Sequence, residues 1–362
     1  MRGLYIHVPF CSRKCDYCDF TSYADREKDI DTYLEALRVE AALYAELHGT
    51  FDTVYIGGGT PTLLSAPQLK QLVSVTETLT GDSLLKEFTM EANPESVTAE
   101  KADILISSGV NRISIGLQSS RPELLKKIGR TVSPEKFAQA WSVFRNAGFR
   151  NMNADLMTGL PGQTLDDFRK SVKFLSDFKP EHLSLYPLEV HEDTPLGKSG
   201  AEENPDGAAD MYDEACRILP AAGLERYEIS SFAKKGYESR HNLHYWLQEE
   251  YLGLGPAAAS YINGERRTTT SSLDLWMKEL SNGRFPSCTS RETLKGREKD
   301  AEKLILGLRL AGGIEIPSNI FIEFKKEFGS ETAREFLDIQ GCRIKLKPDR
   351  MYLANRIFTE LI

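Results

Sequence analysis

Short apolar runs rich in β-branched and aromatic residues alternate, through the first half of the chain, with longer segments whose apolar positions recur every three to four residues. This pattern predicts strand, loop and helix in repeated order. The six predicted strands cover residues 4–8, 53–56, 87–91, 112–116, 151–157 and 182–186. With 362 residues, the chain is long enough for one large α/β unit and a smaller appendage.

Polar or glycine-rich sequence follows the end of each of the first five predicted strands. An open parallel sheet binds ligands mainly at one switch point, whereas a barrel brings all its strand ends around one mouth. We therefore predict an incomplete, TIM-like β/α barrel of about six βα units. A seventh unit, at residues 226–229, is faint, and no eighth is visible.

Several helix boundaries are legible. Ser133 followed by Pro134 predicts an N-cap with proline in the first turn, and Thr164 with Asp167 resembles a capping box. A helix predicted over residues 30–47 carries an apolar stripe that suits packing against a sheet.

The second half of the chain has a different texture. Residues 227–261 are dense in glycine and aromatic residues and predict a surface-lying connection, and residues 282–299 look like a polar linker. Beyond them the pattern predicts helices at 301–310, 319–328 and 332–339 and a two-stranded ribbon at 343–353 that turns at residues 348–349. That order is winged-helix-like. We expect a barrel over residues 1–230, a connecting segment over 231–300 and a C-terminal domain over 301–362.

Composition narrows the function classes. The net charge is −8 and no basic block stands out, which argues against nucleic acid as the main partner. No apolar run approaches 18 residues and the N-terminus lacks a secretion signal, so we expect a cytoplasmic protein without a transmembrane segment, and leave peripheral membrane contact open. The charges of the C-terminal region nearly balance, which favours a packing or lid role over DNA binding.

Three cysteines, Cys11, Cys15 and Cys18, follow the first predicted strand within eight residues. Soft thiolates select zinc or an iron–sulfur cluster. A structural zinc site needs four ligands, and His7 is the one candidate fourth. A disulfide would leave one thiol over and need an oxidising compartment. The loop offers three ligands and has Phe20 where a fourth could follow, so a cluster with one open iron fits better.

The remaining cysteines are isolated in the sequence, and we expect them to be small apolar residues of the core: Cys216, Cys288 and Cys342. The run Gly57-Gly58-Gly59-Thr60-Pro61 follows a strand but lacks the Lys-Ser/Thr of a phosphate-binding P-loop. Successive glycines let a backbone approach a ligand such as a charged amino-acid group closely. A plain tight turn is the alternative.

The Cys-x3-Cys-x2-Cys spacing, with Tyr17 before the third cysteine, resembles the radical S-adenosylmethionine (SAM) superfamily. Four further stretches match one branch, namely Gly57 to Pro61, Glu91-Ala-Asn-Pro94, residues 109–119 and residues 155–162. That branch is the oxygen-independent coproporphyrinogen III oxidase (dehydrogenase)-like family, which includes the HemW heme chaperones. The resemblance covers nearly the whole chain.

The resemblance implies that the three cysteines hold a [4Fe–4S] cluster whose open iron is taken by SAM. It implies a SAM pocket lined by Tyr5, Tyr17, Gly58, Gly59, Thr60, Glu91, Gln118, Arg130 and Asp155. In that pocket Arg130 would pair with the methionyl carboxylate and Glu91 would receive the amino group. Gln118 and Asp155 would bind the ribose, and Tyr17 the adenine.

Within the family, the sequence favours a chaperone over a dehydrogenase. Dehydrogenases carry a further cysteine where this chain has Phe20, and an N-terminal extension before the first ligand. The His-Asn-x-x-Tyr-Trp pattern typical of the chaperones provides tentative heme contacts, with His244 as a second histidine near the iron: His241, Asn242, Tyr245 and Trp246. The family usually has a histidine at Ala259, so any role of that histidine is in doubt here.

We therefore expect a heme chaperone that binds heme and a SAM-ligated [4Fe–4S] cluster and delivers heme to acceptor proteins. No catalytic residue is assigned, and the sequence leaves open whether SAM is cleaved or only bound. The first alternative is a radical SAM enzyme acting on a tetrapyrrole, either a coproporphyrinogen dehydrogenase or a related methyltransferase. A DNA-binding regulator, which would show salt-dependent binding to duplex DNA, is the other.

Overall fold

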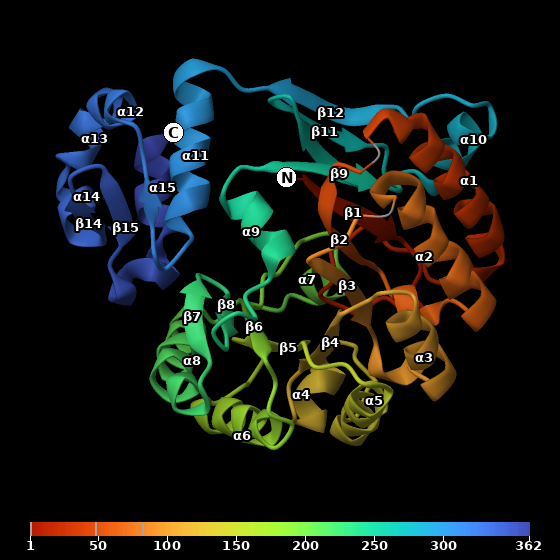
Figure 1. Ribbon diagram of the computed structural model, residues 1–362. Coiled ribbons are helices and arrows are strands. Elements are labelled where there is room, and N and C mark those ends of the chain that lie inside the picture. The colour runs from red at the N-terminus through yellow and green to blue at the C-terminus, as the bar shows by residue number, and fades with distance from the viewer. Residues whose placement is uncertain (1, 48, 82) are drawn as a thin grey trace.

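Six parallel strands form the centre of the structure, a computed structural model that describes residues 2–47, 49–81 and 83–362. They are neighbours in chain order: β1 (Arg2–Val8), β2 (Phe51–Gly58), β3 (Glu87–Ala92), β4 (Arg112–Gln118), β5 (Met152–Thr158) and β6 (His182–Pro187). Figure 1 shows the sheet curving so that these strands surround a common interior. The prediction of an incomplete β/α barrel is confirmed.

Helices cover the outer face of this barrel (Figure 1). They are α1 (Ile30–Leu43), α2 (Ala66–Thr80), α3 (Ala99–Ser107), α4 (Pro122–Lys127), α5 (Pro134–Ala147), α6 (Leu165–Ser176) and α8 (Pro205–Ile218), with the short α7 (Pro195–Lys198) in the loop after β6. The predicted caps are confirmed, because Ser133 accepts a bond from the Lys136 amide and Thr164 forms a capping box with Asp167. Helix α1 ends at Leu43, four residues before the predicted end.

Further strands extend the sheet at both edges. Beyond β6 lie β8 (Ser231–Ala233) and β7 (Glu225–Glu228), and β7 runs antiparallel to β8. The faint seventh βα unit at 226–229 is therefore an edge strand and does not continue the barrel. Beyond β1 lie β9 (Glu250–Leu254), β10 (Ala259–Ile262), β11 (Glu265–Thr269) and β12 (Cys288–Thr293).

The segment expected as a surface-lying connection thus contributes strands to both edges of the sheet. Two of its three glycines, Gly253 and Gly255, are sites of close backbone approach. A Cβ atom on Gly253 would lie 2.2 Å from the Ala259 carbonyl oxygen, so only glycine lets β9 meet β10 here. Two helices complete this part of the chain, α9 (Arg240–Trp246) and α10 (Leu273–Ser281).

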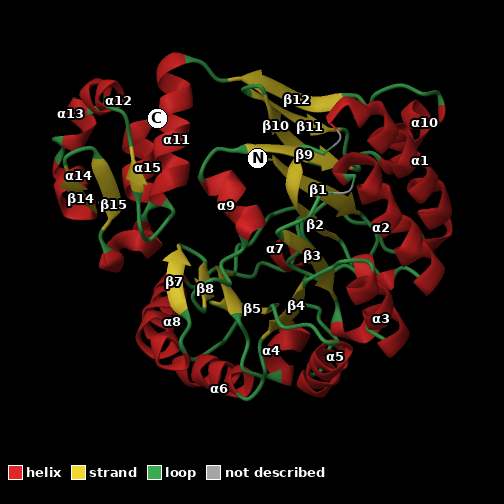
Figure 2. Cartoon of the chain, in the orientation of Figure 1, coloured by secondary structure: helices red, strands yellow, loops and turns green. Residues whose placement is uncertain are grey.

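The C-terminal region has a hydrophobic core of its own. It contains α11 (Gly296–Leu308), β13 (Ile314–Glu315), α12 (Ser318–Glu323), α13 (Lys325–Phe328), α14 (Glu331–Phe336), β14 (Leu337–Gln340), β15 (Arg343–Leu346) and α15 (Asn355–Leu361). Figure 2 shows these helices around a small sheet, apart from the barrel. The ribbon predicted over residues 343–353 is wrong in its position along the chain. It turns at Gly341, whose φ is +61°, and residues 348–353 form a 3-10 helix.

The C-terminal region is joined to the barrel at the β7 edge. The Ala311 amide donates to the Tyr227 carbonyl oxygen at 2.9 Å, and Arg226 donates to the Pro348 carbonyl oxygen at 2.8 Å. The rings of Tyr212 and Tyr352 pack with centroids 4.9 Å apart. No helix in the described part of the chain is long and apolar enough to cross a bilayer.

Candidate functional site

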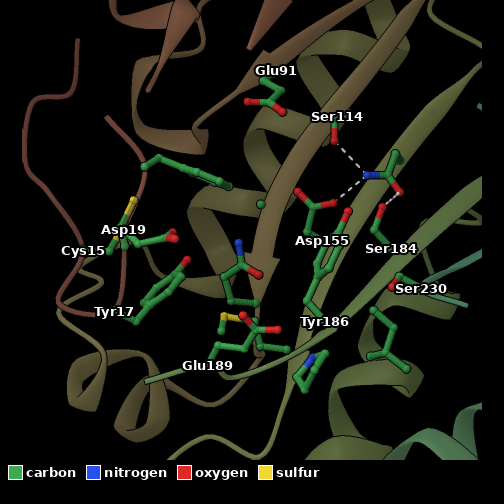
Figure 3. A pocket seen from close by; sticks show the side chains of 18 of the residues that line it. Cys15, Tyr17, Asp19, Glu91, Ser114, Asp155, Ser184, Tyr186, Glu189 and Ser230 are labelled. Carbon is green, nitrogen blue, oxygen red and sulfur yellow. Dashed lines mark hydrogen bonds between the residues drawn. The ribbon is translucent and has the colours of Figure 1, made fainter. Parts of the chain in front are cut away.

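A cavity of about 800 Å³ opens at the carboxyl ends of the barrel strands. The loop after β1 forms one wall, the inner strand ends form the floor, and residues of the C-terminal region form part of the opposite wall. In Figure 3, Cys15, Tyr17 and Asp19 lie on one side of the cavity and Ser230 lies on the other.

The three cysteines of the loop after β1 all line this cavity. Two backbone hydrogen bonds hold the loop to the barrel. The Asp16 amide donates to the Ile128 carbonyl oxygen at 3.0 Å, and the Leu196 amide donates to the Asp16 carbonyl oxygen at 2.8 Å. Gly129 leaves room for this docking, because a Cβ atom there would lie 2.4 Å from the Asp16 carboxyl carbon. The thiols are thus presented by a loop held to the barrel.

The environment of the thiols bears on the ligand they would hold. Burial raises the pKa of Cys11 and of Cys18, and the Thr60 hydroxyl lies 3.7 Å from Cys11 Sγ as a donor. No group of three or more His, Cys, Asp or Glu among the described residues could hold a single metal ion.

His7, the candidate fourth ligand of the zinc alternative, is engaged at both ring nitrogens. His7 is 6% exposed, its Nδ1 lies 2.9 Å from the Tyr5 hydroxyl, and its Nε2 lies 2.7 Å from the Thr21 carbonyl oxygen. A cluster takes one thiolate per iron and needs no fourth protein ligand when one iron is open. The donor set therefore fits a cluster better than zinc.

The glycine run after β2 packs against the protein's own groups. A Cβ atom on Gly57 would lie 2.6 Å from the Glu91 carboxyl carbon, and one on Gly59 would lie 2.6 Å from the Phe10 carbonyl oxygen. Gly58 has φ of +105° and abuts the His7 ring. Glycine is required here because the run lies between the cysteine loop and Glu91, and Gly58 and Gly59 still line the cavity.

Glu91, at the end of β3, is held toward this run. It accepts hydrogen bonds from the Tyr55 hydroxyl at 2.6 Å and from the Gly58 amide at 3.1 Å. Burial raises the pKa of Glu91 to about 7, although these two hydrogen bonds favour the charged form. A cationic amino group placed beside Glu91 would restore its charge.

Gln118, Arg130, Asp155 and Tyr17 line the floor and near wall. The register between β4 and β5 shifts before Gln118, whose φ of +66° is unusual for a non-glycine residue. Arg130 donates to the Gly116 carbonyl oxygen at 2.9 Å, and its buried Nε has no partner among the described residues. Burial raises the pKa of Tyr17 to about 12, against the opposing effect of nearby Arg130.

Asp155 belongs to a polar network on the barrel floor that the sequence analysis missed. Asn153 donates to Asp155 and to the Ser114 hydroxyl, each at 2.7 Å, and accepts from Ser184 at 3.1 Å (Figure 3). Burial raises the pKa of Asp155. Arg112 also lines the cavity and is only 2% exposed. The signal in the sequence that could have identified this network was the presence of polar residues at alternate positions of β4 and β5.

Two sets of predicted site residues lie elsewhere. Tyr5 is not among the residues that line the cavity, and its hydroxyl faces His7. Of the four tentative heme contacts, only Asn242 lines the cavity. Helix α9 instead packs where the strands begin, because the Glu87 carboxylate accepts bonds from the Ser239 hydroxyl and the Arg240 and His241 amides.

The two histidines of this segment have no unoccupied ring nitrogen. His241 is 1% exposed, with Nδ1 2.9 Å from the Thr53 hydroxyl and Nε2 2.8 Å from the Tyr245 hydroxyl. His244 lies between Asp52, at 3.0 Å, and Glu249. Gly3, the neighbour of His241 on β1, is five residues before the end of that strand, or about 17 Å along it, and the cysteine loop begins beyond that end. Iron ligation by His241 would require breaking one of its two bonds.

Comparison with known proteins agrees with this arrangement. The model of the Radical SAM superfamily matches residues 5–175. A heme chaperone HemW from Bacillus subtilis (strain 168) is 39% identical over 322 residues, which cover 87% of this chain and 85% of that relative. The heme chaperone HemW from Escherichia coli (strain K12) is 38% identical over 261 residues, or 71% of this chain and 69% of that relative.

The chain belongs to the radical SAM superfamily and, within it, to the family of the HemW proteins. Coproporphyrinogen III oxidase (HemN) from Escherichia coli has the same fold, with a TM-score of 0.85 over 99% of this chain and 89% of that one at 21% identity. Membership of the superfamily implies SAM and a [4Fe–4S] cluster as cofactors. The cavity has three thiols on one wall and, on its floor, a buried guanidinium nitrogen without a partner among the described residues, so it has donors that suit both.

Proposed function

We propose that this protein is a HemW-like heme chaperone, which holds a SAM-ligated [4Fe–4S] cluster, binds heme in the cavity and passes heme to an acceptor protein. The observation that carries the proposal is the shared cavity. One space is lined by the cysteine loop, by the residues expected to bind SAM and by the C-terminal region. The HemW relatives, named as heme chaperones, support the choice of heme.

In this proposal Cys11, Cys15 and Cys18 would hold the cluster, whose chemistry when bound would be one-electron transfer. Arg130 pairs with the SAM carboxylate, because its Nε lacks a partner in the part of the chain that the structure describes and its guanidinium lines the cavity. Glu91 accepts the amino group. Burial of these residues excludes water and strengthens their electrostatic contacts.

The residues proposed to bind the ribose and the adenine of SAM line the same cavity. Gln118 and Asp155 accept or donate to the ribose hydroxyls, and Tyr17 contacts adenine, with Gly58, Gly59 and Thr60 supplying backbone and hydroxyl groups beside them. Tyr5 supports the site through His7, which abuts Gly58.

The segment with the His-Asn-x-x-Tyr-Trp motif, residues 241–246, is called the motif segment, and fewer of its residues are proposed to contact heme than the sequence predicted. Asn242 reaches the cavity, whereas His241, Tyr245 and Trp246 support the wall behind it. Heme lies in this proposal between the cysteine loop and the C-terminal region, where Ile229, Met351 and Tyr352 provide apolar and aromatic cover.

Replacement of the cysteines tests the cluster. Anaerobic reconstitution of the parent should give roughly four irons per chain, and Cys11→Ala, Cys15→Ala and Cys18→Ala should each abolish the cluster absorbance. Cys216→Ala, Cys288→Ala and Cys342→Ala are matched controls that should keep full iron. If one control proves equally necessary, the cluster is fully ligated and the open-iron arrangement is wrong.

A paired assay separates the chaperone from the dehydrogenase. Reconstituted protein is titrated with heme and followed by Soret absorbance, and a second sample is incubated with coproporphyrinogen, SAM and a strong reductant. The proposal expects saturable heme binding and no protoporphyrinogen. Formation of protoporphyrinogen would establish the dehydrogenase instead.

A further inference from the structure

The outer wall of the cavity carries one basic side chain from the C-terminal region, Arg309, at the end of α11. The other basic residues of the lining belong to the cysteine loop or to the barrel floor: Arg13, Lys14, Arg112 and Arg130. Ser230, Asn242 and Asn355 line the same cavity as neutral polar groups. Arg309 and these three residues are not among those expected to hold the cluster or SAM.

The guanidinium of Arg309 is oriented by its neighbours but not saturated by them. Its central carbon lies 4.2 Å from the ring centroid of Trp246, a cation–π contact. Its carboxylate partner is Glu228, at 3.9 Å between Nη2 and Oε2, which is too long for a hydrogen bond. Its buried Nε has no hydrogen-bond partner among the described residues, and the side chain is 25% exposed.

Glu228 is already engaged elsewhere. Its Oε2 accepts from the Ser230 amide at 3.0 Å, and burial raises the pKa of Glu228. The positive charge of Arg309 is therefore only weakly offset from within the protein. A planar guanidinium with an unpaired buried donor on a cavity wall is the arrangement that binds a carboxylate in a fork.

We propose that Arg309 recognises a carboxylate of the tetrapyrrole cargo, held in place by Trp246 and assisted by the polar groups of Ser230, Asn242 and Asn355. The proposal rests on the proposed function, because heme bears two propionate groups. It also assigns a role to one residue of the motif segment, Trp246. Trp246 acts as a positioning residue for Arg309, since Figure 1 places α9 between the barrel and α11 and the two helices are in contact.

Heme and its dimethyl ester, in which both propionates are blocked, provide the test. The parent protein, with its cluster reconstituted, is titrated with each under anaerobic conditions and followed by Soret absorbance. Hydrogen bonds to charged groups correspond to roughly 10- to 100-fold in affinity, so the parent should prefer heme over the ester by that factor. Arg309→Met should lose the preference, Arg309→Lys should keep part of it, and Trp246→Leu should reduce it.

Arg226 is the matched control. It also joins the barrel to the C-terminal region, through the Pro348 carbonyl oxygen, but it does not line this cavity. Arg226→Met should retain the preference for heme. Equal loss in Arg226→Met and Arg309→Met would mean that the effect comes from the junction between barrel and C-terminal region, and would overturn the proposal.

The remaining outcomes separate this proposal from the function on which it rests. Equal binding of heme and ester by the parent would overturn the role of Arg309 and leave the heme chaperone standing. Failure of the parent to bind either compound would overturn the proposed function itself. Iron content and thermal unfolding of each variant establish that the cluster and the fold are intact.

Discussion

Replacing His241 by alanine tests whether this motif histidine is a structural residue of the barrel. The ring is 1% exposed, and both of its nitrogens are hydrogen-bonded to buried or half-buried hydroxyls, those of Thr53 and Tyr245. Two hydrogen bonds contribute about 1 kcal/mol each, and the cavity left by the ring adds a comparable amount. The free energy of unfolding should fall by about 3 kcal/mol.

The assay is urea unfolding at pH 7.5, with His191→Ala as the matched control. His191 lines the cavity with a side chain 44% exposed, and its nearest carboxylate oxygens are 3.5 and 3.8 Å away. Its replacement should change the unfolding free energy by less than about 0.5 kcal/mol. A His241→Ala protein as stable as the parent would refute the reasoning, because the ring would then not be held as described.

The pH dependence of the same variant gives a second, independent check. Burial lowers the pKa of His241 to about 3, below the value of 6.5 in the unfolded chain. The unfolded state therefore takes up a proton below pH 6.5 while the folded state does not, and the parent loses about 1.4 kcal/mol per pH unit from this group. The destabilisation by His241→Ala should shrink from about 3 kcal/mol at pH 7.5 to about half that at pH 5.5.

Two further predictions concern buried carboxyl groups. Glu40 accepts a hydrogen bond from the Gly255 amide at 2.8 Å, and burial raises its pKa to about 7. The free energy of unfolding should therefore fall by roughly 3 kcal/mol as the pH rises from 4.5 to 7, because the folded state holds the proton more tightly than the unfolded state. Glu40→Gln should reduce this pH dependence when unfolding is measured at pH 5 and pH 8. Gly57→Ala should displace Glu91, whose carboxyl carbon would lie 2.6 Å from the new methyl group, and weaken SAM binding about tenfold by equilibrium dialysis while the cluster iron stays unchanged.

The barrel and the cysteine loop were predictable from the sequence because their signals are local. Strands 4–8 to 182–186 carry apolar runs at regular spacing, and the residues after them are polar because they surround the mouth. The helix starts at Ser133 and Thr164 were predictable for the same reason, since capping is decided within four residues.

The edge strands were not predictable, because their signal depends on partners far along the chain. Gly253 and Gly255 suggest a loop until β10 and the His7 carbonyl oxygen are seen to leave no room for a side chain. The C-terminal ribbon was misplaced because Pro348 and Asp349 form an attractive local turn, whereas the hairpin turns at Gly341, which adopts a positive φ.

The role of the motif segment was also not predictable, because the partners of its side chains lie far away in the sequence. A histidine beside tyrosine and tryptophan suggests a cofactor contact, and nothing near it in the sequence identifies Glu87 or Thr53 as its partners. The inner polar residues Arg112 and Asn153 were passed over because polar residues at alternate positions of a strand do not show which strands share an interior. Only the fold brings them together beneath one cavity.

Electron paramagnetic resonance of the reduced, reconstituted protein tests the central claim most directly. If Cys11, Cys15 and Cys18 hold a cluster with an open iron facing the cavity, addition of SAM should change the spectrum of the reduced cluster, and addition of heme should leave the cluster signal in place. A cluster spectrum that SAM leaves unchanged would contradict the account, because all four irons would then already have ligands.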